Sequence, residues 1–153
     1  ILVIKCFRNA IICLRYFTVY GPRGRPDMAP YKFITAIHNQ EVFNKYGTGE
    51  SSRDYTYIDD IVVGVISALE NKKNIQCEVY NLGHSKPVSL NTFIELCEKV
   101  VQKKALYNQI CVQKGDVPHT FADITNAKQD LNYNPQISLG EGLEKLFKWI
   151  QFL

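Results

Sequence analysis

The sequence lacks any apolar stretch long enough to cross a bilayer as a helix. Its apolar start, residues 1–7, is separated by Arg8 from the next apolar run at residues 10–14, whereas a membrane-spanning helix needs about 20 such residues. The start also has neither an initiator methionine nor a small-residue cleavage pattern, so we do not expect it to be a signal peptide. We therefore expect no membrane partner, and we interpret the chain as a truncated or excised piece.

Neither positive nor negative charge is concentrated in one segment of the chain. The 18 lysines and arginines against 15 acidic residues give a net charge of +3, and the basic residues are scattered. A nucleic-acid partner is therefore not expected. With 46% hydrophobic and 22% charged residues, the composition is that of an ordinary globular domain.

The cysteines form no recognisable ligand or redox pattern. There are five, an odd number, with no C-x-x-C pair and no cysteine–histidine ligand spacing; they are Cys6, Cys13, Cys77, Cys97 and Cys111. Most lie in apolar runs, so we expect reduced thiols in the core and a cytoplasmic location.

Catalytic machinery is also missing from the sequence. It has no metal-ligand cluster and no nucleophile–base pair, and residues 21–24 contain too few glycines for a nucleotide-binding fingerprint. The histidines His38, His84 and His119 share no ligand spacing, which favours surface or loop roles.

What remains is recognition chemistry. Arg23 and Arg25 lie in a glycine- and proline-rich turn, and Arg53 opens a segment with two tyrosines. Guanidinium groups suit phosphate and carboxylate ligands. The alternative is that these arginines are solvated or pair with Asp27 and Asp54.

Strands and helices alternate along the chain. Strands are expected at residues 11–17, 41–46, 53–57 (half exposed), 79–82 and 110–113, and helices at about 27–38, 58–69, 89–101, 125–131 and 138–150. This order predicts an α/β or α+β layered fold for residues 1–153 as one unit, with a sheet that is part of a larger one. Asp27, Asp59 or Asp60, and Ser89 are the expected helix caps, and Ser138 with Glu141 forms a capping box. Asp59 and Asp60 alternatively resemble a catalytic carboxylate pair, but adjacent residues point in different directions, which favours capping.

Three segments resemble one enzyme family. Residues 14–29 (LRYFTVYGPRGRPDMA), 52–61 (SRDYTYIDDI), and 115–118 (GDVP) followed by 121–124 (FADI) are similar, in order and spacing, to UDP-glucuronate 4-epimerases of the extended short-chain dehydrogenase/reductase superfamily. The resemblance covers Leu14 to the end of the chain. It implies the carboxy-terminal part of that fold, which is the end of a Rossmann sheet plus a small α/β substrate-binding subdomain.

The resemblance also implies a reaction and its partners. These enzymes use NAD, held mainly by an amino-terminal Rossmann domain that this chain does not contain, to epimerise C4 of a UDP-sugar. The family's catalytic Tyr-x-x-x-Lys pair would precede Ile1, so the chain alone is expected to be inactive. A separate Rossmann-domain chain and a homodimer of the full-length form are the implied protein partners.

Site residues follow from the same resemblance. Thr18 corresponds to a position beside the sugar, Arg25 to a loop arginine near the substrate, and Arg53 to the arginine that holds the pyrophosphate. The edge strand at Asn44, Lys45 and Tyr46 corresponds to the uracil contact, and Gln113 and Asp116 to positions near the phosphates and ribose. We expect Arg25, Arg53 and residues 44–46 to meet in one cleft. A related dehydratase, decarboxylase or other epimerase, or a degenerate UDP-sugar-binding fragment, is the alternative.

Overall fold

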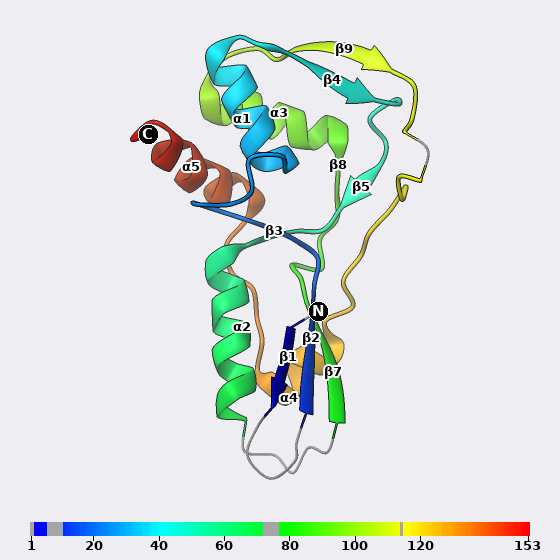
Figure 1. Ribbon diagram of the computed structural model, residues 1–153, viewed down its shortest axis with the longest axis vertical. Helices are drawn as coiled ribbons and strands as arrows, with labels where there is room; N and C mark the ends of the chain where they lie inside the picture. Colours follow the sequence, from blue (N-terminus) through cyan, green and yellow to red (C-terminus); the bar gives the residue numbers. More distant parts are fainter. Residues whose placement is uncertain (1, 6–10, 72–76, 114) are drawn as a thin grey trace.

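The computed structural model describes residues 2–5, 11–71, 77–113 and 115–153. They form two lobes stacked along the long axis (Figure 1). The lower lobe is built on a three-stranded sheet, and the upper lobe on three helices with a two-stranded ribbon. Each lobe has its own hydrophobic core.

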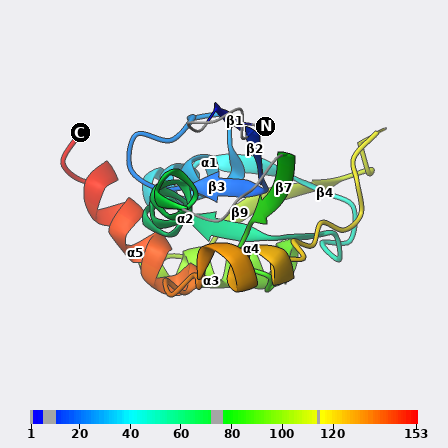
Figure 2. The same cartoon turned by 90° about the horizontal axis from the view of Figure 1, so that it is seen from below.

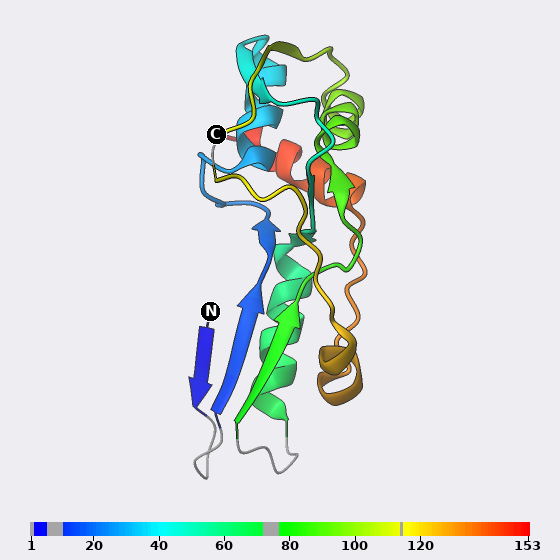
Figure 3. The same cartoon turned by 90° about the vertical axis from the view of Figure 1, so that its right-hand side faces the viewer.

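The sheet of the lower lobe has the order β1 (Leu2–Lys5), β2 (Ile11–Tyr16), β7 (Cys77–Leu82). β1 is antiparallel to β2, and β7 is parallel to it. Ile12 and Leu14 of β2 point into the core, which also contains Tyr80 of β7. Helices α2 (Ile58–Glu70) and α4 (Thr125–Leu131) cover this one face of the sheet (Figure 3).

The upper lobe packs α1 (Ala29–Asn39), α3 (Leu90–Val101) and α5 (Leu139–Ile150) against one another. Beside them lies the parallel ribbon of β4 (Val42–Tyr46) and β9 (Leu106–Ile110). Aromatic stacking joins ribbon to helices, because the Phe43 ring lies 4.4 Å from that of Phe33. The Tyr55 ring stacks on Phe93 at 4.6 Å.

Short strand pairs lie where the lobes meet (Figure 1). β3 (Thr18–Tyr20) runs parallel to β6 (Tyr55–Tyr57), and β5 (Ser52–Arg53) runs antiparallel to β8 (Val88–Ser89). The buried carboxylate of Asp54, between β5 and β6, accepts backbone N–H bonds from His84, Ser85 and Ala122 at 2.8–3.0 Å. This carboxylate therefore joins three segments that are distant in sequence.

Several expectations from the sequence are confirmed. The strands at 11–17, 41–46 and 79–82 and all five helices are present, with boundaries shifted by a residue or two. Ser89 accepts the Thr92 N–H at the start of α3, and the Ser138–Glu141 capping box opens α5. Pro30 lies in the first turn of α1.

The expected caps at Asp27, Asp59 and Asp60 are wrong. α1 begins after Met28, and Asp27 instead accepts hydrogen bonds from Arg25. Both α2 aspartates lie inside the first helical turn, where the helix dipole favours them, but neither caps it. Asp60 is buried and accepts the backbone N–H groups of Gln136 and Ile137.

Two strand expectations and one on cysteines are also corrected. The last strand is Leu106–Ile110, not 110–113. The 53–57 segment is not half exposed, since Asp54 through Tyr57 are all buried at the junction between the lobes. Cys77 and Cys111 are exposed, although Cys97 is a buried free thiol as expected; Cys6 lies outside the described residues.

The described part of the chain contains no helix that is both long and apolar enough to cross a membrane. Within those same residues, no cluster of three or more histidine, cysteine, aspartate or glutamate side chains is arranged to hold a metal ion.

Candidate functional site

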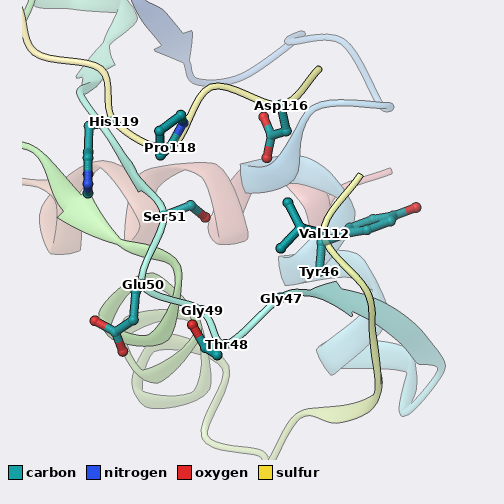
Figure 4. A pocket seen from close by; sticks show the side chains of 10 residues that line it. All are labelled: Tyr46, Gly47, Thr48, Gly49, Glu50, Ser51, Val112, Asp116, Pro118 and His119. Atoms are coloured by element: carbon teal, nitrogen blue, oxygen red, sulfur yellow. The ribbon is translucent and has the colours of Figure 1, made fainter. Parts of the chain in front are cut away.

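A cavity of about 190 Å³ opens where β4 ends, at the side of the upper lobe. Figure 4 shows the turn at residues 47–51 along one side of it and the later segment with Asp116, Pro118 and His119 along another. The lining residues are Tyr46, Gly47, Thr48, Gly49, Glu50, Ser51, Val112, Asp116, Pro118 and His119.

The turn requires its glycines. Gly47 and Gly49 have φ values of +63° and +87°, which L-residues with side chains rarely adopt. A Cβ at Gly49 would lie 2.0 Å from Oδ1 of Asn91 and 2.8 Å from Cε of Lys45. Asn91, at the start of α3, donates to the Thr48 carbonyl and to the Glu50 carboxylate. The floor of the cavity is therefore backbone held tightly against α3.

The second wall is pinned to β5 by a ladder of hydrogen bonds. The Ser52 N–H donates to the Pro118 carbonyl at 2.9 Å, and the Thr120 N–H donates to the Ser52 carbonyl at 3.1 Å. The Ser52 hydroxyl and Nδ1 of His119 are hydrogen bonded at 2.9 Å. Because this wall is bonded to Ser52 of β5, Asp116 lies beside Arg53, the residue that follows Ser52 in the chain.

Arg53 is connected to the cavity by its ion pair with Asp116, which lines the cavity. Its guanidinium donates to the carbonyls of Ser52 and Pro118, and it forms an ion pair with the Asp116 carboxylate. The two side chains are 22% and 41% exposed, so the pair is partly shielded from water. A partly desolvated guanidinium next to an open cavity is suited to binding an anion.

The edge strand contributes side chains to both sides of the ribbon. Tyr46 lines the cavity, and Lys45 is buried on the opposite side, with Nζ 4.9 Å from the centre of the Tyr107 ring. Asn44 is exposed and lines a separate pocket of about 330 Å³ together with Pro26 and Thr35. The end of β4 therefore borders the cavity, and its beginning borders the neighbouring pocket.

Three other residues that were predicted as site residues are not part of the cavity lining. Gln113 is exposed, and its carbonyl accepts the Asp116 N–H at 3.2 Å. Thr18 is half-buried in β3, where its N–H donates to the Asp54 carbonyl. Arg25 is 76% exposed and binds Asp27, whose pKa is lowered by these hydrogen bonds. Of the predicted site residues, Tyr46 and Asp116 line the cavity, Arg53 is paired with Asp116, and Gln113 is bonded to Asp116 through its backbone. Thr18, Arg25, Asn44 and Lys45 do not line this cavity, so the expectation that Arg25, Arg53 and residues 44–46 meet in one cleft is wrong.

Of the ten lining residues, only Tyr46 and Asp116 were singled out from the sequence as site residues, and Ser51, Val112 and His119 are among the eight that were missed. His119 follows Asp116-Val-Pro directly, so its position in that motif was a signal that could have placed it here. An aromatic ring, a carboxylate and a nearby guanidinium are groups suited to holding a nucleotide.

Comparison with known proteins agrees with this geometry. The family model described as "NAD dependent epimerase/dehydratase family" matches residues 6–83. UDP-glucuronate 4-epimerase of Thermodesulfobacterium geofontis is 45% identical over 140 residues, which cover 91% of this chain and 42% of that protein. A probable UDP-glucuronate 4-epimerase of Rhizobium meliloti is 40% identical over 152 residues, covering 88% and 45%.

Solved structures show the same fold. UDP-glucuronic acid 4-epimerase from Bacillus cereus, in complex with UDP-glucuronic acid and NAD, superposes with a TM-score of 0.88 at 42% identity, covering 92% of this chain and 45% of that one. UDP-glucose 4-epimerase from Thermotoga maritima, with UDP-glucose, gives a TM-score of 0.82 at 32% identity, covering 92% and 46%. The expected α/β fold, a part of the extended short-chain dehydrogenase fold, is thereby confirmed.

The chain spans less than half the length of these relatives, between 42% and 46%. The family model, by contrast, covers half of this chain, from strand β2 through the buried 54–57 segment to the end of β7. On that match the chain belongs to the NAD dependent epimerase/dehydratase family.

Proposed function

We propose that this chain is the UDP-sugar-binding part of an NAD-dependent UDP-sugar 4-epimerase, acting on UDP-glucuronate to give UDP-galacturonate. The observation that carries the proposal is the position of Arg53, whose guanidinium is paired with Asp116, a residue that lines the cavity. A diphosphate is the ligand group that such a guanidinium favours. The similarity to enzymes solved with UDP-glucuronic acid supports the same ligand.

The roles of the individual residues follow from their positions. Tyr46 offers a ring for stacking on the uracil, with Asn44 and Lys45 contributing backbone groups of the same strand. Arg53 binds the pyrophosphate. Gln113 and Asp116 hydrogen bond the ribose side of the ligand.

Arg25 and Thr18 are proposed to contact the sugar. Arg25 would exchange its exposed partner Asp27 for the sugar carboxylate. Such an exchange costs little, because exposed ion pairs contribute about 1 kcal/mol or less. A preference for UDP-glucuronate over UDP-glucose is the expected consequence.

The described residues lack the glycine-rich turn of a dinucleotide-binding fold. Gly21 and Gly24 lie in a turn followed by Pro26 and do not form the G-x-G-x-x-G turn that opens a dinucleotide-binding helix. NAD supplies hydride transfer when bound, and we assign its binding and the catalytic Tyr-x-x-x-Lys pair to the amino-terminal half of the fold. The residues of this chain bind and orient the sugar nucleotide. That half is either joined to this chain or a separate partner, and the complete protein is proposed to be a homodimer.

Calorimetric titration of the chain with UDP and UDP-glucuronate tests the binding part. We expect both to bind, and Arg53→Ala to abolish the heat because the diphosphate loses its charged partner. Arg15→Ala is the matched control, since Arg15 is exposed on β2 and the charge change is the same. A folded wild-type chain that gives no heat with either ligand rejects the site.

We propose that turnover requires the amino-terminal half of the fold. Co-expression with the amino-terminal half of the Thermodesulfobacterium geofontis relative should give conversion of UDP-glucuronate to UDP-galacturonate. Faster conversion of UDP-glucose would favour a neutral-sugar epimerase instead. Binding without turnover in a folded complex would leave the chain as a UDP-sugar-binding fragment.

A further inference from the structure

His119 is a residue of the cavity wall to which the ligand contacts described above give no role. It lines the cavity together with Asp116 and Pro118 (Figure 4). Seen from below, the segment that follows β9 lies at the opposite side of the molecule from α5, so that helix does not cover the cavity (Figure 2). The His119 side chain is exposed, and a ligand in the cavity can therefore reach its imidazole.

The Ser52 hydroxyl orients the imidazole ring. Nδ1 of His119 and Oγ of Ser52 are hydrogen bonded at 2.9 Å, and Nε2 has no hydrogen-bond partner among the residues that the structure describes. A hydroxyl both donates and accepts, so it can pair with Nδ1 whether or not this nitrogen carries a proton. In the neutral ring, donation from Ser52 to Nδ1 places the ring proton on Nε2. In the imidazolium both nitrogens are protonated, so Nε2–H is available to a ligand in either charge state.

Arg53 and His119 are attached to the same hydrogen-bonded pair of residues. The Ser52 N–H donates to the Pro118 carbonyl at 2.9 Å, and in the chain Arg53 follows Ser52 while His119 follows Pro118. The Arg53 guanidinium also donates to the carbonyls of Ser52 and Pro118, at 2.9 and 3.4 Å. The guanidinium and the imidazole are therefore held by one hydrogen-bonded piece of backbone beside the cavity.

The charges at the cavity leave a diphosphate short of positive partners. Glu50 and Asp116 line the cavity, and Arg53 is paired with Asp116. Two carboxylates and one guanidinium leave a net charge of −1. In a sugar nucleotide each of the two phosphates carries a negative charge, which this combination does not balance. A protonated His119 would offset the excess of negative charge.

Neighbouring elements do not supply the missing positive charge. Lys45 precedes Tyr46 in β4, but its Nζ lies 4.9 Å from the centre of the Tyr107 ring on the opposite side of the ribbon. β8 (Val88–Ser89), which pairs with the other edge of β5, has no charged side chain. His119 is therefore the group beside Arg53 that can gain a positive charge.

We propose that His119 is a further binding residue for the sugar nucleotide, whose Nε2–H donates a hydrogen bond to the diphosphate and whose protonated form adds a second cation beside Arg53. The inference rests on the proposed function, which places the diphosphate at Arg53. Histidine side chains change charge between about pH 5 and 8, whereas arginine and carboxylate groups such as Arg53, Glu50 and Asp116 ordinarily do not. Because the ligand favours the protonated ring, its affinity rises as the pH falls through this range.

Calorimetric titration with UDP-glucuronate at about pH 8 and about pH 5.5 tests the inference. Both phosphates of this ligand are diesters, so they lack the proton that a terminal phosphate exchanges at about pH 6. We expect the wild type to bind about fivefold more tightly at the lower pH, as one partly exposed charge pair implies. His119→Gln should lose this gain but stay within about threefold of the wild type at the higher pH, because its amide still offers an N–H donor. His38→Gln, which removes an imidazole from α1, is the control and should keep the gain.

A second measurement requires only the wild type. When UDP-glucuronate is bound, the NMR signal of the His119 imidazole should titrate with a midpoint at higher pH, because a ligand that prefers the protonated ring also favours its protonation. An equal gain in the wild type and in His119→Gln, or a midpoint that the ligand does not move, overturns the role of His119 and leaves the proposed function standing. A folded wild type that gives no heat at either pH overturns both.

Discussion

The guanidinium of Arg53 and the carboxylate of Asp116 form an ion pair although the two residues are 63 positions apart. The backbone ladder between Ser52 and residues 118–120 brings them together. Asp116 thus pairs with the guanidinium that is proposed to bind the diphosphate, so Asp116 and the ligand compete for the same cation.

Replacing Asp116 should therefore strengthen binding of a simple anion. In Asp116→Asn, Arg53 no longer has its carboxylate partner, and a partly exposed pair is worth up to about 1 kcal/mol, or about fivefold in affinity. Calorimetry with inorganic pyrophosphate should show that gain. Glu144→Gln, an equal charge change on the exposed side of α5, should leave the affinity unchanged. Equal gains in both variants would indicate a general charge effect instead.

Removal of the Asp54 carboxylate should destabilise the whole chain. In Asp54→Ala the backbone N–H groups of His84, Ser85 and Ala122 lose their acceptor inside the protein, and we expect a loss of about 3 kcal/mol or more. Urea unfolding followed by circular dichroism measures it. Asp59→Ala, whose carboxylate side chain is 63% exposed, should change stability by about 0.5 kcal/mol or less. Similar losses in both would refute the role of burial.

Two glycines of α5 should respond oppositely to alanine. A Cβ at Gly142 would lie 2.0 Å from the hydroxyl oxygen of the buried Tyr20, whereas a Cβ at Gly140 meets nothing within 4 Å. Gly142→Ala should lower stability by about 1–3 kcal/mol through overpacking. Gly140→Ala should raise it by up to about 1 kcal/mol through helix propensity. Thermal unfolding of both variants decides, and a stabilised Gly142→Ala would contradict the packing.

The capping box of α5 should contribute to acid sensitivity. The hydroxyl and backbone N–H of Ser138 donate to the Glu141 carboxylate and lower its pKa. Because the folded pKa lies below the unfolded value of about 4.3, this stabilisation is present above the unfolded pKa and is lost as the pH falls through the folded one. Glu141→Gln and Ser138→Ala should both show a smaller fall in Tm between about pH 5 and pH 3. An unchanged fall in both would contradict the assignment.

Local chemistry made part of the fold predictable. Ser89 and the Ser138–Glu141 pair are caps because their partners lie three residues away in the chain. The apolar spacing along residues 58–69 likewise predicted helix α2. Asp60 does not cap, since its partners lie more than 70 residues away.

The site was predictable only in its motif residues. Arg53 and Asp116 followed from the family resemblance, and the structure brings them together. Burial of residues 54–57 was missed, because the partners of Asp54 lie in distant segments: its carboxylate accepts backbone N–H groups of residues 84, 85 and 122, and its own N–H donates to the Thr120 hydroxyl. His119 was missed although it directly follows the Asp116-Val-Pro motif, because its hydrogen-bond partner Ser52 lies 67 positions away in the sequence.

The path of the chain makes the two lobes inseparable. The core of the lower lobe contains residues from three separate segments: Ile12 and Leu14, residues within 61–82, and residues within 122–133. The core of the upper lobe likewise contains residues within 20–57, residues within 93–101, and Leu143 and Leu146. Neither core is encoded by one continuous stretch. A protease that cut any single connection would therefore release no folded half, and no single genetic crossover can exchange one lobe while leaving the other whole.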